Sequence, residues 1–166
     1  MTIKHAVFIV CISFIILVLG CAGGISRQSR SMVTYKGSFS ALQKTPGSYK
    51  GEVVMLGGRI IETKISSPLS ELTILQVPLD GSGRPVDSDQ SQGRFIIQAK
   101  KILDPEIYRK DMSITVVGAL KGSKVLSIGG FNYTYPIVEP IEIKLWPKGE
   151  RSRPAVHFGF GIGTSF

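Results

Sequence analysis

Five runs of β-forming residues, separated by turn-forming residues, constrain the fold of this chain more than any other feature. β-Branched and aromatic side chains favour strands, and clusters of glycine, proline and small polar residues favour turns. Several short strands at this spacing predict a sandwich or a barrel. The runs cover residues 51–65, 71–79, 93–99, 112–120 and 133–146, with a long polar loop over 80–93.

Glycine and proline add local detail to two of these runs. Gly57 and Gly58 lie inside the first run, where glycine marks a bulge, a sharp bend or a close backbone approach. Pro136 and Pro140 interrupt the last run, and proline cannot donate a hydrogen bond to a sheet. The last strand is therefore predicted to be an edge strand or a bent one.

One convincing helix is predicted between the third and fourth strands, over residues 104–111. Asp104 suits the N-cap, Pro105 the first helical position and Glu106 the first turn. A further short helix within 35–49 would place Phe39 and Leu42 on one face. This order predicts a mainly β fold: a small five-stranded OB-like β-barrel with one short helix between strands three and four. A β-sandwich is the alternative.

The amino-terminal segment indicates export. Residues 6–19 are apolar except for Ser13, and Lys4 precedes them. A bilayer-spanning helix needs about 20 apolar residues, whereas about 10–14 suit the hydrophobic region of a signal peptide. We therefore predict that residues 1–20 are a signal peptide that is removed.

The end of this segment, Leu17-Val18-Leu19-Gly20-Cys21, resembles the lipobox of bacterial lipoproteins. The resemblance implies cleavage between Gly20 and Cys21, a diacylglyceryl group on the Cys21 thiol, and further acylation, with palmitate as a typical chain. Two or three acyl chains anchor a protein stably to a membrane. The alternative is a small apolar residue at the end of a signal anchor. Because Cys11 lies in the removed segment, no thiol would remain for a disulfide.

Cleavage would leave 166 − 20 = 146 residues, enough for one domain with its own core. We expect a flexible tether over 21–34, a barrel domain over 35–147 and a basic, Gly-rich tail over 148–166. The charge of +8 becomes +7 without Lys4. This excess suits anionic lipids or polyanionic glycans, or serves solubility alone. An exported, anchored chain rarely meets nucleic acid, so no nucleic-acid partner is expected.

The sequence carries little that points to catalysis. His157 is the only histidine of the mature chain, and no G-x-S-x-G, H-E-x-x-H or Walker pattern occurs. Asp87 and Asp89 loosely resemble a calcium loop, but the glycine falls one position late and no glutamate follows. We expect a solvated loop there, no metal or cofactor, and a chain that is not an enzyme.

Aromatic and basic residues suggest a binding surface. Tyr133, Tyr135 and Trp146 lie on or beside the last strand and, with Arg94, could form a sugar- or peptide-binding face. The alternative is that Trp146 and at least one tyrosine close the barrel core. Residues 144–154 place Trp146 among basic residues, which suits a membrane interface, an anionic glycan or merely a connector.

With these runs placed, residues 45–147 resemble the Slp (starvation lipoprotein) family of outer-membrane lipoproteins. The resemblance implies a non-enzymatic, periplasm-facing outer-membrane lipoprotein with a structural or interaction role in the cell envelope. A glycan- or small-ligand-binding module using the barrel face is the alternative. The implied partners are the membrane, through the lipid anchor, and an envelope protein or anionic glycan or lipid. The matching motifs are Tyr49-x-Gly51, Gly57-Gly58, Pro78-Leu79-Asp80, Gly83-Arg84-Pro85, Gly93-Arg94-Phe95, Leu103-Asp104-Pro105-x-x-Tyr108, Thr115-Val116-Val117-Gly118, Tyr135-Pro136 and Leu145-Trp146-Pro147.

Overall fold

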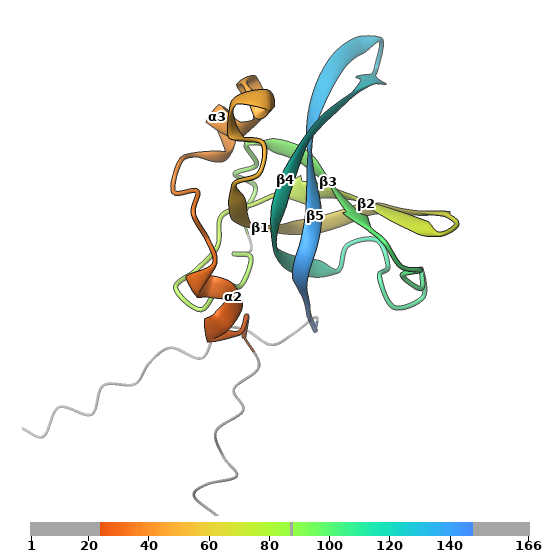
Figure 1. The fold of residues 1–166 in the computed structure, drawn as a ribbon. Helices are drawn as coiled ribbons and strands as arrows, with labels where there is room; N and C mark the ends of the chain where they lie inside the picture. The colour runs from red at the N-terminus through yellow and green to blue at the C-terminus, as the bar shows by residue number, and fades with distance from the viewer. Residues whose placement is uncertain (1–23, 87, 148–166) are drawn as a thin grey trace, which may run out of the picture.

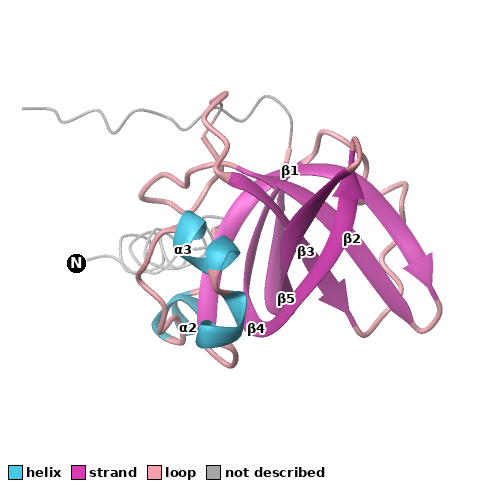
Figure 2. Cartoon of the chain, turned by 90° about the horizontal axis from the view of Figure 1, so that it is seen from above, coloured by secondary structure: helices cyan, strands magenta, loops and turns pink. Residues whose placement is uncertain are grey.

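Five strands close into a barrel in the computed structural model, which describes residues 24–86 and 88–147 (Figures 1 and 2). The strand order around the barrel is β1-β2-β3-β5-β4, and all pairs are antiparallel except β3 with β5. The predicted five-stranded barrel is confirmed, and the sandwich alternative is wrong. The strands are β1 (Val53–Ser66), β2 (Leu69–Gln76), β3 (Gly93–Ala99), β4 (Ser113–Ile128) and β5 (Phe131–Trp146).

The glycine pair in β1 allows one strand to serve both halves of the barrel. Gly58 lies opposite Gln76 of β2 and opposite Ile114 of β4. A Cβ atom on Gly58 would overlap the carbonyl oxygen of Leu75 and lie 2.8 Å from its carbonyl carbon. The predicted close backbone approach is therefore confirmed.

A long hairpin joins β4 to β5 through Gly129 and Gly130, which have φ angles of +58° and +88°. β4 continues to Ile128, well past the expected end at residue 120. The β4–β5 register shifts twice, between Val117 and Gly118 and between Leu120 and Gly122, and Pro140 lies opposite Gly118. β5 is therefore bent, as its prolines predict, and it closes the barrel beside β3.

The segment between β3 and β4 forms turns, so the prediction of a helix over 104–111 is wrong. The Asp104 carbonyl does accept from the amides of Ile107 and Tyr108, at 3.0 and 2.9 Å. The Tyr108 carbonyl then accepts the Thr63 hydroxyl at 2.6 Å, and the Asp111 amide donates to Ile60 at 2.8 Å. These bonds to β1 hold the backbone in turns, so the helix-like hydrogen bonds that start at Asp104 do not continue into a helix.

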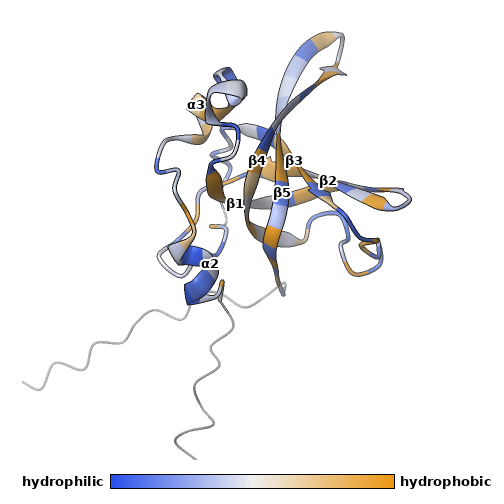
Figure 3. Cartoon of the chain, viewed as in Figure 1, coloured by the Kyte–Doolittle hydropathy of each residue, from blue (hydrophilic) through white to orange (hydrophobic). Residues whose placement is uncertain are grey.

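The second predicted helix is present as α3 (Phe39–Lys44), followed by the 3-10 helix η1 (Pro46–Tyr49). Phe39 and Leu42 are buried, and the ring centroids of Phe39 and Phe95 lie 6.0 Å apart. α3 thereby joins a core built from all five strands. Figure 3 shows apolar residues along these strands and polar residues on α2. No helix within the described ranges is long and apolar enough to cross a membrane.

A flexible tether over 21–34 is not what the structure shows for residues 24–34. Ile25 and Ser29 are buried, and α2 (Arg27–Ser31) begins at an N-cap formed by Ser26. The Ser26 hydroxyl donates to Glu142 at 2.6 Å. Burial raises the pKa of Glu142, but hydrogen bonds from Ser26 and Ser29 and the charge of Lys144 outweigh burial and lower it. The segment docks because its small polar and apolar side chains find partners on the barrel.

Candidate functional site

Trp146 is not on a binding surface, which corrects that part of the predicted aromatic face. Its side chain is 5% exposed, and its indole N–H donates to the Thr115 hydroxyl at 2.9 Å. The Thr115 hydroxyl in turn donates to the Gly83 carbonyl at 2.7 Å. The Arg84 guanidinium lies 5.2 Å from the centroid of the Trp146 ring. Trp146 and the loop around Gly83 are therefore linked to β4 of the barrel through the Thr115 hydroxyl.

Asp80 organises this loop, a role that the sequence analysis missed. One carboxylate oxygen accepts from the amide and hydroxyl of Ser82, at 2.8 and 2.6 Å, and from the Arg84 amide at 3.0 Å. Arg84 reaches on to the Pro147 carbonyl at 3.1 Å, and Arg30 of α2 donates to the Ser82 carbonyl. An aspartate before Gly-x-Gly is a turn signal that could have indicated this role.

The other three predicted surface residues do come together, at the far end of β5 from Trp146. The Arg94 amide donates to the Tyr133 hydroxyl at 2.8 Å, and the rings of Tyr133 and Tyr135 lie 4.9 Å apart. Tyr135 is only 4% exposed, so the alternative that one tyrosine joins the core is confirmed. Arg94 and Tyr133 stay partly exposed, and the four residues do not form one site.

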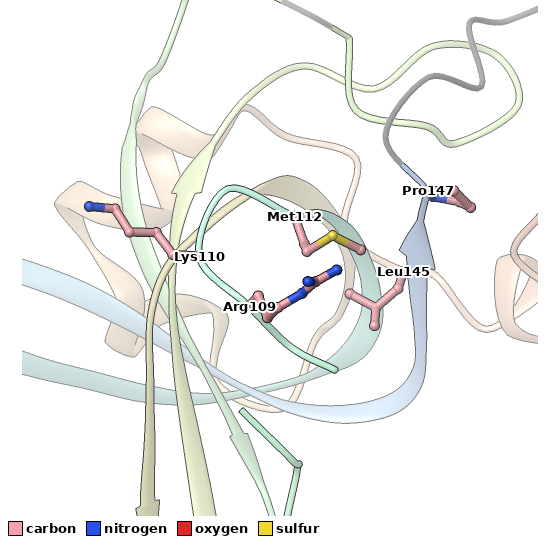
Figure 4. A pocket seen from close by; sticks show the side chains of 5 residues that line it. All are labelled: Arg109, Lys110, Met112, Leu145 and Pro147. Carbon is pink, nitrogen blue, oxygen red and sulfur yellow. The ribbon is translucent and has the colours of Figure 1, made fainter. Parts of the chain in front are cut away.

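A pocket lies where the turns before β4 meet the end of β5 (Figure 4). Its volume is about 460 Å³, within the usual range for small-molecule sites. Met112 and Leu145 pack against the barrel core and remain partly exposed. They supply an apolar wall to the pocket. The lining residues are Arg109, Lys110, Met112, Leu145 and Pro147.

The charged residues that line this pocket, Arg109 and Lys110, are both cationic. Figure 4 shows the Arg109 side chain directed between Met112 and Leu145, whereas the Lys110 amine points away. In the described part of the chain, neither cation has a carboxylate within salt-bridge distance. An apolar wall beside a guanidinium suits an anionic group that carries an apolar body. In the sequence, only the adjacent cations Arg109 and Lys110 mark this place, and such a pair does not by itself indicate a pocket.

Other predicted functional residues lie outside the described ranges. They are Gly20 and Cys21, the cleavage and lipidation site; Asp87 of the polar loop; and His157 of the tail. Asp89 is exposed. No group of three His, Cys, Asp or Glu side chains that could hold a metal ion occurs within residues 24–86 and 88–147.

Solved structures with a related outline include mitochondrial single-stranded DNA binding protein Rim1 from Saccharomyces cerevisiae. It shares 18% identity and a TM-score of 0.38, covering 61% of this chain and 100% of that chain. A small single-stranded DNA-binding protein from Streptomyces coelicolor shares 13% identity at a TM-score of 0.37, covering 57% and 94%. The assignment of the barrel rests on its own strand order and register.

Sequence relatives are bacterial. An uncharacterized protein of Haemophilus influenzae is 33% identical over 96 residues, covering 57% of this chain and 52% of that protein. The uncharacterized lipoprotein YeaY of Escherichia coli is 26% identical over 134 residues, covering 81% and 69%. The outer membrane protein Slp of Escherichia coli is 29% identical over 109 residues, covering 66% and 57%. The chain thus spans about half the length of the first relative.

The model of one protein family matches nearly the whole chain. The match runs from residue 18 to residue 161, which is 161 − 18 + 1 = 144 of 166 residues, and includes every strand of the barrel. The predicted family is confirmed: the chain belongs to the outer membrane lipoprotein Slp family.

Proposed function

We propose that this Slp-family lipoprotein is anchored by acyl chains on Cys21 and faces the periplasm from the outer membrane. Its role there is structural or interactive and involves no catalysis. The observation that carries the proposal is the family match, which begins at Val18 and so takes in Gly20 and Cys21 together with the barrel. Two or three acyl chains supply enough apolar surface for stable anchoring.

The docked amino-terminal segment supports an anchor that holds the barrel close to the bilayer. Ile25 is buried, and it lies four positions after Cys21 in the sequence. Four steps along the chain span at most about 14 Å, even when fully extended. An acylated Cys21 would therefore keep the barrel at the membrane surface, where it can meet envelope components.

Replacing Cys21 by serine tests the anchor. We expect the wild-type chain to lose residues 1–20, gain acyl mass and fractionate with the outer membrane. The C21S variant should retain residues 1–20 and gain no acyl mass. Intact-mass measurement with membrane fractionation gives both readouts, and Cys11→Ser is the matched control, expected to behave as wild type. If wild type and C21S showed the same processing, the same acyl content and the same membrane fraction, the proposal would be contradicted.

The pocket favours a second function for the same protein, the binding of a small anionic amphiphile. Arg109 offers a planar fork of donors to a carboxylate or phosphate, and Met112 and Leu145 offer contact for an apolar chain. This is a small-ligand role like the alternative raised by the sequence. Its place is the end of the barrel and not the aromatic face.

A fluorescent long-chain fatty acid is the probe for this pocket. Titrated into the protein, it should bind, and Arg109→Gln should weaken binding about ten-fold, equivalent to about 1.4 kcal/mol. Lys36→Gln is the matched control, because Lys36 is an exposed cation outside the pocket. A fatty alcohol of the same length should bind more weakly and be insensitive to Arg109→Gln. Absence of binding, or equal loss in both variants, would contradict this function.

A further inference from the structure

Four cations gather where α2 docks on the barrel, and we call them the α2 cation cluster. Arg30 of α2 donates to the carbonyl oxygen of Ser82, so α2 lies against the loop that carries Arg84. The Arg84 guanidinium and the Lys144 amine lie 5.2 and 5.7 Å from the centroid of the Trp146 ring. The fourth cation is exposed on the same short helix. The cluster consists of Arg27, Arg30, Arg84 and Lys144.

Carboxylates offset only part of this charge. The Asp80 carboxylate accepts from the Arg84 amide at 3.0 Å. The Glu142 carboxylate accepts from the Ser26 amide at 3.1 Å. The four cations exceed these two carboxylates by 4 − 2 = 2 charges. Within the described ranges, no ion pair includes a cation of the cluster. This face of the barrel is therefore cationic.

The cluster also lies where the chain leads toward Cys21. A Cβ atom on Gly24 would lie 3.5 Å from the Ser82 carbonyl oxygen, the same oxygen that accepts from Arg30. Gly24 is three positions after Cys21, and three steps along the chain span at most about 11 Å. An acyl chain on Cys21 would thus begin within about 11 Å of Gly24, beside the cluster.

We propose that the α2 cation cluster rests on the headgroups of anionic lipids in the membrane that holds the anchor. The inference depends on the proposed anchor at Cys21 and adds which face of the barrel meets the bilayer. A guanidinium binds phosphate through paired N–H donors. The attraction of a basic residue to an anionic bilayer extends over about 10 Å, so the short span to Cys21 places the cluster within its range.

The same short span favours a lipid surface over a soluble glycan as the partner. Both are polyanions that suit a cationic face. The anchor, however, brings only the membrane to within about 11 Å of Gly24. The β4–β5 hairpin extends from the barrel at the end away from α2 (Figure 1), so with the cluster on the bilayer this hairpin would point away from it.

Fluorophores on single cysteines test the orientation of the lipidated protein. Removal of residues 1–20 and acylation of Cys21 leave no free thiol, so Gln28→Cys on α2 and Ser127→Cys on the hairpin each give one labelling site, and both positions are exposed. The probe is a vesicle of phosphatidylcholine with phosphatidylglycerol that carries a headgroup quencher. Quenching of the Gln28→Cys label should exceed that of the Ser127→Cys label about five-fold, and the ratio should fall toward one in vesicles of phosphatidylcholine alone. A ratio independent of lipid charge would overturn the proposal.

Neutralising one cation of the cluster provides the second arm. Each basic residue near an anionic bilayer strengthens binding about five-fold, so Arg27→Gln should lower the proportion of molecules that rest on this face by about that factor. The matched control is Lys101→Gln, because Lys101 is an exposed cation on the segment after β3 and outside the cluster. Equal quenching in both variants would overturn the proposal.

These measurements separate the cluster from the anchor. Protein that binds the vesicles with no dependence on lipid charge or on Arg27 would overturn this inference and leave the anchor standing. Protein that carries no acyl chain and binds neither vesicle would contradict the anchor and this inference together. High salt should reduce quenching of the Gln28→Cys label without releasing the acylated protein, because salt screens charge and leaves the acyl chains inserted.

Discussion

Gly58→Ala is expected to lower the free energy of unfolding by about 3 kcal/mol or more, the upper range for overpacking in a core. The added methyl group would run into the backbone carbonyl of Leu75 and lie 2.7 Å from the Cγ2 atom of Ile74. Backbone cannot rotate out of the way as a side chain can. β1 would have to separate from β2 where it also contacts β4, and chemical denaturation should report the loss.

Gly47→Ala provides the control for Gly58→Ala. A Cβ atom on Gly47 meets nothing within 4 Å, and its φ angle is not in the left-handed region. Its substitution should leave stability unchanged or raise it by about 0.4–1 kcal/mol, through lower entropy of the unfolded chain. Similar losses from both substitutions would mean that general glycine effects, and not the close approach of β1 to β2, explain the change.

Thr115→Val is expected to cost about 2–4 kcal/mol, because one hydroxyl serves two buried partners. Valine keeps the shape of threonine but removes the acceptor for the Trp146 indole N–H and the donor to the Gly83 carbonyl. Both partner groups would remain with an unmet hydrogen bond. The change should appear in denaturant unfolding and as altered tryptophan fluorescence, since the chain has one tryptophan.

Thr115→Ser separates this hydrogen-bonding effect from packing. Serine keeps the hydroxyl and loses one methyl group, so its cost should be near 1 kcal/mol. Combining Thr115→Val with Trp146→Phe should cost less than the sum of the two single changes, because phenylalanine has no N–H to leave unpaired. Equal costs for the valine and serine variants would show that the hydroxyl contributes little.

Elements that depend on residues close together in the sequence were predicted correctly, and elements that depend on distant residues were not. The strands over 93–99 and within 51–65 and 71–79 were predictable, because β-branched residues and alternation act within a few positions. α3 was predictable from Phe39 and Leu42 in the same way. The segment 104–111 has good helix-start residues and still forms turns, because its backbone bonds to Thr63 and Ile60 of β1. A local pattern cannot represent those distant partners.

The candidate site, too, was predicted in part and missed in part. Arg94 and Tyr133 were rightly expected to be neighbours, and the tyrosine contribution to the core was an open alternative. The pocket beside Arg109 was missed, because a helix was expected where the structure has turns. Whether Met112 and Leu145 are covered depends on how that segment closes over the barrel end.

By itself, the sequence determined the strand-rich character of the chain, the close backbone approach at Gly58, and membership of the Slp family. These depend on residue order and on the size of single side chains. Only the tertiary structure decided that Trp146 lies beneath a loop and that residues 24–34 dock on the barrel. The physical reason is separation along the chain. Thr115 meets Trp146 and Gly83 across 31 and 32 residues, and Ser26 meets Glu142 across 116, so only the folded chain brings these partners together.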